Sequence, residues 1–524
     1  MSSPLHVLDY CIILAFLIVS LAFGLVFAKS QKTTQNYFLA KGKIPSWALG
    51  ISLLATLISS VTFLAYPGTG FSSNWILLVQ GLMVPVVLLV VIWFIVPLFR
   101  KVINLSTYEY FERRFGPFAR YYSSIAFVLR QFSGMGTVFF LLAISLEKMT
   151  NIDTVTIILV VGSIIIFINL MGGIEAVIWL DVFQGFMLFA SGIICISALL
   201  FSVEGGPAAV WEIASENGRT GFGPYEWDLT KLTFVVMAIN GAFYAIQKYA
   251  TDQTVVQRYL TAKTDKSAIN ASLLGILLTV PVWTLFMLIG TALFVFYKQN
   301  PLPSDLRADA VFPYFIMTQL PTGVVGLILS AMISAAICSL SADLNSLAAV
   351  GVEDYYKKIS PGKTDKQYLL ASKVIVVLSG LISVGIAMLY LNAGDEGVLG
   401  IVFTLYAIFS GGIVGIFLLG LFSSRANNQG INIAIVTCII FTAYAFLTST
   451  PIGIGENKKL LLDLGALNFT HHKLMLGVYS HLIVIGVGYA ASLFFPKPEL
   501  DQRLLYKGWR EIRRATERLI ESTP

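Results

Sequence analysis

Five charged side chains stand inside strongly apolar stretches of this sequence, and they are its first candidates for chemistry. They are Asp181 in "GGIEAVIWLDVFQG", Lys248 and Asp252 in "AIQKYATDQTVVQRYL", Asp343 in "ICSLSADLNS" and Arg130 in "VLRQFSG". A charge within a membrane-spanning helix is costly, and it usually binds an ion or solute or pairs with an opposite charge. The alternative is a residue at a helix end that reaches the membrane surface, and this alternative applies most readily to Asp252 and then to Arg130.

The stretch "ICSLSADLNS", residues 337–346, is filled with small polar side chains although the sequence around it is apolar. On a helix, Cys338, Ser341 or Ala342, and Asn345 share one face, while Ser339, Asp343 and Ser346 share the adjoining face. Uncharged hydroxyl and carbonyl oxygens suit a hard monovalent cation. The stretch therefore predicts part of a sodium site, and the alternative is a serine-lined face for helix packing.

The elements that must position these residues are membrane helices. The chain has 524 residues, of which 56% are hydrophobic and 12% charged, whereas soluble domains carry about 25% charged residues. Because about 20 apolar residues cross a bilayer, the sequence predicts thirteen spans. Their approximate ranges are 7–28, 45–66, 75–98, 121–147, 154–171, 177–202, 232–250, 268–297, 321–352, 369–391, 399–423, 430–449 and 473–495.

The basic residues predict how the chain is oriented. One set of alternate loops, together with the C-terminal tail, carries 24 lysines and arginines, and the opposite set carries 7. Cytoplasmic loops are enriched in these residues, so we expect the N-terminus outside and the C-terminus in the cytoplasm. We expect one transmembrane transporter domain over residues 1–495 and a basic cytoplasmic tail over residues 496–524, with a helix that lies on anionic headgroups.

Two of the predicted spans show signs of interruption. The second, "GISLLATLISSVTFLAYPG", runs into Tyr66-Pro67-Gly68, and the seventh, "VVMAINGAFYAIQKY", holds Asn240-Gly241. Transporters place broken helices at corresponding positions of two repeats, where freed carbonyls bind ions or substrate. The two spans are five apart, which is the spacing that two five-helix repeats would give. Serines that bond to the preceding helical turn are the alternative explanation for the polar residues there.

Several strings, taken together, resemble the sodium/solute symporter family, which includes sodium/glucose cotransporters and sialic acid symporters. They are "ATLISSVTFLAYPG", "STYEYFERRFG", "GGIEAVIWLDVFQ", "TDQTVVQRYLTAKT", "AAICSLSADLNSLAAVGVEDYY" and "FSGGIVGIFLLGLF". The resemblance covers about residues 5–495. It implies an all-α polytopic membrane protein with a LeuT-type inverted five-plus-five repeat, at about 45–202 and 232–423, and extra helices. It also implies sodium-driven uptake by alternating access.

The resemblance implies positions for the coupling ions. The main sodium site would use the carbonyls of Ala55, Ile58 and Ala335 and the side chains of Cys338 and Ser339. The family usually has serine at position 338, and a thiol is a poor sodium ligand, so the site would rely on Ser339 and carbonyls.

The resemblance also implies a possible second sodium site. It would use Asp181, Cys338 and Ser341, although Ala342 lacks the hydroxyl found in members that have this site.

The substrate region is predicted from the same comparison. Candidate substrate or gating residues are Ser59, Thr62, Gln80, Gln247, Lys248 and Arg130. The carboxylate-binding arginine of sialic acid symporters aligns with Gly134, and Arg130 lies one turn earlier. Neutral donors and acceptors favour a monosaccharide or sugar derivative, sialic acid included. The alternative is a monocarboxylate, a vitamin or an inorganic anion.

Other classes of function have less support in the sequence. We see no filter-like repeated loop of a channel, no signalling domain of a transporter-like sensor, and no nucleophile–base pair or metal cluster of an enzyme. The four cysteines lie in apolar runs and the four histidines lack metal-ligand spacing. We therefore expect a multi-pass protein of the plasma or bacterial inner membrane. Its expected partners are sodium, a small solute and lipid, with no other cofactor and no nucleic acid, and one chain would suffice for transport.

Overall fold

The computed structural model describes residues 5–303, 306–392, 411–452, 459–460 and 462–511, and these residues are folded almost entirely into helices. Nine helices of the described residues are long and apolar enough to cross a membrane, and a tenth span is obtained when the bent pair α3 and α4 is counted as one. The nine are α1 (Val7–Ala28), α5 (Ile76–Val102), α7 (Pro117–Thr150), α8 (Thr154–Ser202), α12 (Asp265–Gln299), α14 (Val324–Val350), α16 (Asp365–Asn392), α19 (Asn428–Ser449) and α20 (Lys473–Ser492).

Shorter elements connect or interrupt the long helices. The helices are α2 (Thr34–Leu39), α3 (Ser46–Leu57), α4 (Ser60–Ser72), α6 (Tyr108–Phe115), α9 (Gly206–Glu216), α10 (Phe234–Ile246), α11 (Gln253–Thr261), α13 (Ala308–Gln319), α15 (Lys357–Ile359) and α18 (Ile413–Phe422). Single turns of 3₁₀-helix are η1 (Ala40–Gly42), η5 (Gly465–Leu467) and η6 (Gln502–Leu504), and π-helical segments are η2 (Gln247–Thr251) and η3 (Gly351–Tyr356). Strands β1 (Pro451–Ile452) and β2 (Lys459–Leu460) form a two-residue antiparallel ladder.

The all-helical membrane architecture expected from the sequence is confirmed. The expected spans 154–171 and 177–202 form the single element α8, in which Gly173 has non-helical dihedrals and marks a kink between two helices. The expected span 399–423 lies partly in residues 393–410, outside the described residues, and its described part is α18.

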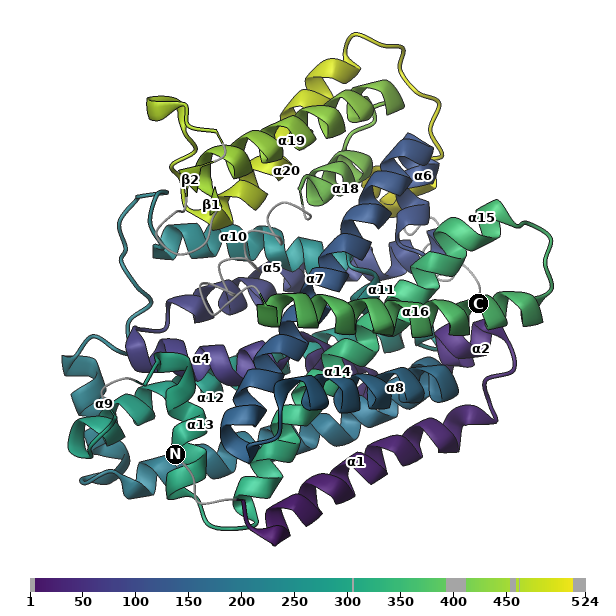
Figure 1. Ribbon diagram of the computed structural model, residues 1–524. Helices are drawn as coiled ribbons and strands as arrows, with labels where there is room; N and C mark the ends of the chain where they lie inside the picture. The colour runs from purple at the N-terminus through teal and green to yellow at the C-terminus, as the bar shows by residue number, and fades with distance from the viewer. Residues whose placement is uncertain (1–4, 304–305, 393–410, 453–458, 461, 512–524) are drawn as a thin grey trace, which may run out of the picture.

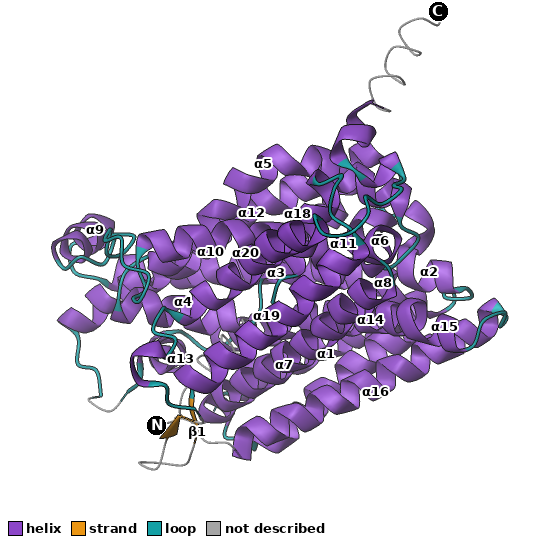
Figure 2. Ribbon diagram, turned by 90° about the horizontal axis from the view of Figure 1, so that it is seen from above, coloured by secondary structure: helices purple, strands orange, loops and turns teal. Residues whose placement is uncertain are grey.

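The helix α14 forms the centre of the bundle. In its apolar window 89% of the residues are buried, against 17% for α1, which places α14 inside and α1 at the perimeter. Figure 1 shows α1 along one edge and α19 with α20 at the opposite edge. In Figure 2 α16 runs along the outside of the bundle, and α9 lies at one end. The polar stretch around residues 337–346 is therefore at the protein core and away from lipid.

The first broken helix is interrupted earlier than the sequence predicted. Helix α3 ends at Leu57, Ile58 and Ser59 are extended, and α4 then continues at an angle of 60°. The expected break at Tyr66-Pro67-Gly68 is wrong, because α4 runs through Pro67. The small residues there serve close packing instead: a Cβ built on Gly290 of α12 would lie 2.2 Å from the Pro67 carbonyl oxygen.

The second broken helix is also interrupted at a different place. Helix α10 passes through Asn240-Gly241 without a break, then becomes the π-helical segment η2, and Asp252 is extended before α11 begins. The expected break at Asn240-Gly241 is therefore wrong. A Cβ on Gly241 would lie 2.9 Å from the Gln80 Cα, so the glycine permits α10 to approach α5 closely.

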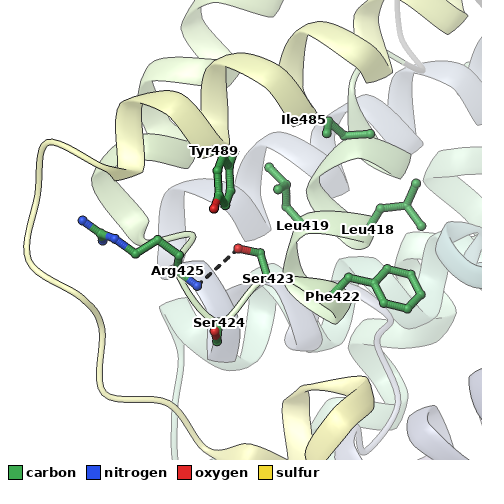
Figure 3. A pocket seen from close by; sticks show the side chains of 8 residues that line it. All are labelled: Leu418, Leu419, Phe422, Ser423, Ser424, Arg425, Ile485 and Tyr489. Atoms are coloured by element: carbon green, nitrogen blue, oxygen red, sulfur yellow. Dashed lines mark hydrogen bonds between the residues drawn. The ribbon is translucent and has the colours of Figure 1, made fainter.

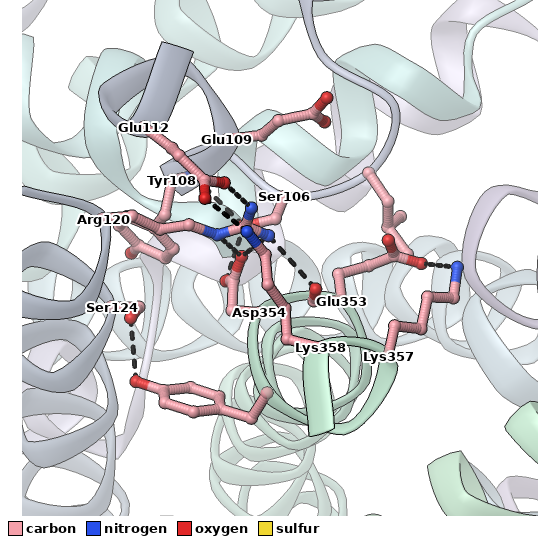
Figure 4. A network of polar contacts seen from close by, with 12 residues as sticks. Ser106, Tyr108, Glu109, Glu112, Arg120, Ser124, Glu353, Asp354, Lys357 and Lys358 are labelled. Atoms are coloured by element: carbon pink, nitrogen blue, oxygen red, sulfur yellow. Dashed lines mark hydrogen bonds and ion pairs between the residues drawn. The ribbon is translucent and has the colours of Figure 1, made fainter. Parts of the chain in front are cut away.

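A network of charges ties one end of the bundle together (Figure 4). Arg120 of α7 pairs with Asp354 of η3 and with Glu112 of α6, and Lys358 of α15 also bonds Glu112. Ser106 donates to Asp354 over 2.7 Å. Partial burial raises the pKa of Glu112, but hydrogen bonds from Lys358 and Arg120 outweigh it, so this pKa lies below its ordinary value. The network holds α6, α7 and η3 as one unit.

We expect Gly173→Ala to destabilise the bundle. Gly173 has φ 55° and ψ −159°, and an added Cβ would lie 2.8 Å from the Tyr37 carbonyl oxygen. A residue forced into such a conformation costs of order 1–3 kcal/mol. Gly385→Ala is the control, because Gly385 is helical and a Cβ there meets nothing within 4 Å. The readout is the temperature at which detergent-purified protein loses monodispersity, and an unchanged temperature for Gly173→Ala would contradict the assigned strain.

Candidate functional site

The candidate site lies where the two broken helices meet α14. Helix α14 packs against α3, α4, α8 and α11, so the ends of both broken helices and the polar stretch of α14 are brought together. This is the arrangement that the resemblance predicted for the elements of the site. The polar groups of the site form three sets. The first consists of backbone carbonyls and a hydroxyl between α3 and α14, the second surrounds Asp181, and the third surrounds Asp252.

The end of α3 supplies backbone oxygen atoms. The Ile58 amide donates to the Ala55 carbonyl over 3.2 Å, and within the described chain no donor bonds the Ile58 carbonyl. Both residues are buried. A buried carbonyl without a donor is unusual in a folded protein, and it is the type of ligand that a hard cation accepts.

The matching residues of α14 lie on consecutive helical positions. The Ser339 hydroxyl bonds the carbonyls of Ala335 and Ala336, each over 3.2 Å. Its proton is therefore directed into its own helix, and its lone pairs are left for another group. The Cys338 thiol instead donates to Gln184 Oε1 of α8 over 2.8 Å. Of the two predicted side-chain ligands, only Ser339 keeps an oxygen atom for the main sodium site.

The Asp181 cluster is a buried ion pair with polar neighbours. Asp181 Oδ2 accepts from Arg258 Nη2 of α11 over 2.9 Å and from the Ser52 hydroxyl of α3 over 2.5 Å. Arg258 Nε also bonds Ser52 Oγ over 2.8 Å, and the Cys338 thiol faces the Asp181 carboxylate. Arg258 and Asp181 are almost completely buried, so each charge is compensated by the other.

Polar atoms without partners lie beside this cluster. Ser341 Oγ and Gln184 Nε2 are buried and make no hydrogen bond within the described chain. Ser341 is one helical turn from Cys338 and belongs to the predicted second sodium site. The cluster therefore brings Asp181 and Cys338 together as predicted and adds Arg258, which supplies the positive charge that a second sodium would otherwise supply.

The Asp252 cluster contains two predicted substrate residues. Asp252 Oδ2 accepts from Arg130 of α7 over 2.5 Å and from Lys248 of η2 over 2.7 Å. Gln131 donates to Asp343 of α14 over 2.5 Å. Asp252 is the N-cap residue of α11 and is 1% exposed, so it does stand at a helix end, but its carboxylate is buried against Arg130 and Lys248. Arg130 also faces this buried carboxylate and not the membrane surface.

The remaining substrate candidates surround the same breaks. Ser59 is half-buried and extended at the first break, and Thr62 is buried one turn into α4. Gln80 is half-buried on α5 beside Gly241 of α10. Gln247 is half-buried at the start of η2. These positions place neutral hydrogen-bonding groups on α4, α5 and η2, and α10 contacts both α5 and η2.

Helix α11 carries buried polar residues of the candidate site that the sequence analysis missed. Gln253 bonds Thr107 and the Leu105 carbonyl, Gln257 bonds the Phe38 carbonyl and Asn345, and Arg258 belongs to the Asp181 cluster. Arg258 lies between the predicted spans 232–250 and 268–297 and was one of the 24 basic residues counted in the cytoplasmic loops and tail, whereas the structure leaves it 1% exposed. Polar residues at positions i, i+4 and i+5 of one nine-residue helix were the available signal.

We expect a double-mutant cycle to show that Asp181 and Arg258 depend on each other. Asp181→Asn or Arg258→Gln alone leaves one buried charge unpaired, which costs roughly 3–5 kcal/mol of unfolding free energy. The double variant removes both charges and should lose less than the sum of the single variants. The measurement is the free energy of unfolding in mixed detergent micelles, and additive effects would rule out the pair.

Comparisons with known proteins agree with this geometry. The profile of the Sodium:solute symporter family matches residues 37–439. The chain is 34% identical to the sodium/sialic acid symporter NanT of Aliivibrio fischeri, over 93% of both chains, and 33% identical to the sodium/sialic acid symporter SiaT of Proteus mirabilis, over 83% of this chain and 88% of that one.

A solved structure shares the fold. It is a sodium-coupled sialic acid symporter in a substrate-bound outward-open state, 27% identical, with a TM-score of 0.86 over 95% of this chain and 100% of that one. Its likeness and the family match confirm the expectation of a multi-pass membrane transporter in place of an enzyme. The chain belongs to the sodium:solute symporter family.

Proposed function

We propose that the chain is a sodium-coupled symporter that imports a small polar organic solute by alternating access. The observation that carries this proposal is the carbonyl of the buried residue Ile58, at the end of α3 where α3 packs on α14, which no donor of the described residues bonds. With Ala55, Ala335 and Ser339 it supplies only uncharged oxygens, which suit sodium better than a transition metal. Sodium is a transported ion here, and one chain contains the whole site.

The proposed topology has thirteen spans with two inverted five-helix repeats, at about residues 45–202 and 232–423. Two features support it: the two broken helices are five spans apart, and the basic residues gather in alternate loops. The proposal places the N-terminus outside and the C-terminal tail in the cytoplasm. Residues 1–495 then form the transporter domain, and residues 496–524 form the tail.

Alternating access is supported by the contacts of α11. Its buried polar residues bond the segment before α6, the carbonyl end of α2, and helices α3, α8 and α14. The Asp252 cluster, at the start of α11, adds contacts to α7. On the proposed orientation these contacts close the cytoplasmic side. Inward opening would separate them, and the energy of sodium and solute binding must favour that change.

The proposed substrate is a monosaccharide or sugar derivative, sialic acid included. Ser59, Thr62, Gln80 and Gln247 offer neutral groups that recognise hydroxyls, and two relatives at 33–34% identity are named as sialic acid symporters. A substrate carboxylate would need a cation, and both nearby cations already bond Asp252. Lys248 is the better donor of the two, because it lies in the irregular segment η2 and Arg130 would remain to compensate Asp252.

A second candidate is a vitamin or another organic anion. A relative from Drosophila melanogaster that is 31% identical, over 87% of this chain and 76% of that one, is named as a putative sodium-dependent multivitamin transporter. For this candidate too, Lys248 would have to leave its ion pair with Asp252 and pair with the carboxylate of the substrate. It differs from the sugar proposal in the competitors that should block uptake.

We expect Ser339→Ala to raise the sodium concentration for half-maximal uptake by about tenfold or more, a change of ~1.4 kcal/mol. Ser339 supplies the one side-chain oxygen of the proposed site, whereas Ser330→Ala removes a similar buried hydroxyl that bonds the Gly326 carbonyl on the same helix. Uptake into proteoliposomes with and without an inward sodium gradient is the measurement. Ser330→Ala should be near wild type, and Cys338→Ser should keep or improve sodium affinity.

Unchanged sodium activation in Ser339→Ala would overturn the main site.

The same assay tests a second sodium at Asp181, Cys338 and Ser341. A Hill coefficient for sodium above one that falls towards one in Asp181→Asn would support the second site. A wild-type coefficient of one would leave Asp181 with its structural pairing alone.

We expect excess sialic acid or monosaccharide to reduce sodium-driven solute uptake by competition, and short monocarboxylates and iodide to leave that uptake unchanged. For a carboxylate-bearing sugar, Lys248→Gln should abolish solute uptake while sodium binding, measured by tryptophan fluorescence, persists. The control for the loss of a lysine charge is Lys266→Gln, at the start of α12. Gln247→Glu would not serve as a control, because it adds a charge. Uptake evoked by a monocarboxylate or iodide and insensitive to sugars would contradict the proposed substrate class.

A further inference from the structure

A cleft of about 390 Å³ lies between the end of α18 and the last turns of α20 (Figure 3). Its walls are apolar along the helices and polar at the turn that follows α18. The apolar residues are Leu418, Leu419, Phe422 and Ile485, and the polar residues are Ser423, Ser424, Arg425 and Tyr489. None of these residues belongs to the sodium or substrate sites described above.

The cleft faces the lipid side of the bundle. Phe422 is 59% exposed and Tyr489 47%, and Phe494 just beyond α20 is 86% exposed. In a membrane-spanning chain, exposed aromatic residues at the ends of helices lie at the boundary between acyl chains and headgroups. From Ile485 to the end of α20 the helix rises by about 10 Å, so the cleft extends from that boundary into the hydrocarbon.

The polar end of the cleft holds a cation, Arg425, that forms no ion pair with a carboxylate of the described residues. Arg425 Nη2 donates to the carbonyls of Leu493 and Phe495, over 3.0 and 2.7 Å. Arg425 Nη1 is buried and makes no hydrogen bond within the described chain. Figure 3 shows the Arg425 side chain extending away from the turn, on the side opposite to Leu418 and Phe422, while the Tyr489 hydroxyl points towards the turn.

We propose that this cleft binds an anionic phospholipid. One acyl chain lies along Leu418, Leu419 and Ile485, and the phosphate is bound at the rim by Arg425, with the hydroxyls of Ser424 and Tyr489 as further donors. Arginine suits phosphate because its N–H groups donate charge-assisted hydrogen bonds, and in Arg425 the N–H groups of Nη1 are not already donated to carbonyls. The basic residues that follow α20, including Lys497 and Lys507, draw anionic lipid to the same membrane surface.

Native mass spectrometry of the delipidated full-length protein tests the proposal, with dioleoyl phosphatidylglycerol and dioleoyl phosphatidylcholine as probes. We expect one phosphatidylglycerol to bind selectively. Arg425→Gln should weaken this binding by about tenfold, as for the loss of a charged hydrogen bond, and Arg425→Lys should weaken it less. Arg503→Gln is the matched control, because Arg503 is exposed and pairs with Asp501, and it should bind like wild type.

A second pair of variants tests the apolar part of the cleft. Ile485→Trp fills the cleft and should reduce phosphatidylglycerol binding, whereas Leu482→Trp lies on the exposed side of the same helix and should not. Variants are compared only as monodisperse protein that retains sodium-dependent solute uptake or sodium binding. Equal affinity for the two lipids, full competition by glycerol phosphate alone, or unchanged binding in both Arg425→Gln and Ile485→Trp would overturn the proposal.

Discussion

The arrangement of this bundle depends on the compensation of charges that cannot reach water. Arg258 and Asp181 are each almost wholly buried and bonded to each other. Asp252 is buried between two cations. Even Asp9 of α1 is buried, where it accepts from the amides of Gly323 and Gly326 at the start of α14. An unpaired charge in such surroundings is very costly, so each of these contacts fixes the relative position of helices that are distant in sequence.

Helix α11 gains its position from this constraint. It is nine residues long and too short to be stable by itself, yet almost all of its residues are buried. Its polar side chains bond four or more separate elements, and none of these bonds can be replaced by water while α11 stays in place. Partial release of α11 would therefore leave buried polar groups unpaired, which is costly.

The sequence predicted the elements well and the breaks poorly. Long apolar runs determine the spans, because a bilayer demands them. Asp181 and Asp252, which stood out as charges in or beside those runs, both lie in buried ion pairs. Pro67 and Gly241 were interpreted as breaks, yet both lie in continuous helices next to close contacts. A glycine that ends a helix and a glycine that admits a neighbour look the same in one sequence. Arg258 shows the same limit. From the sequence its charge was consistent with a loop, and only the structure shows that it pairs with Asp181.

The first break also explains how ion binding can be coupled to the movement of helices. The proposed sodium ligands come from two elements: the carbonyls of Ala55 and Ile58 belong to the broken helix, and Ser339 belongs to the central helix α14. Because the Cys338 thiol is directed to Gln184, α14 contributes one side-chain oxygen, and the ion depends more heavily on the carbonyls of α3. Those carbonyls approach α14 only while α3 remains packed against it. Sodium would therefore bind more tightly to the state in which α3 and α14 are in contact, and this difference in affinity is the physical requirement for the ion to change the population of states.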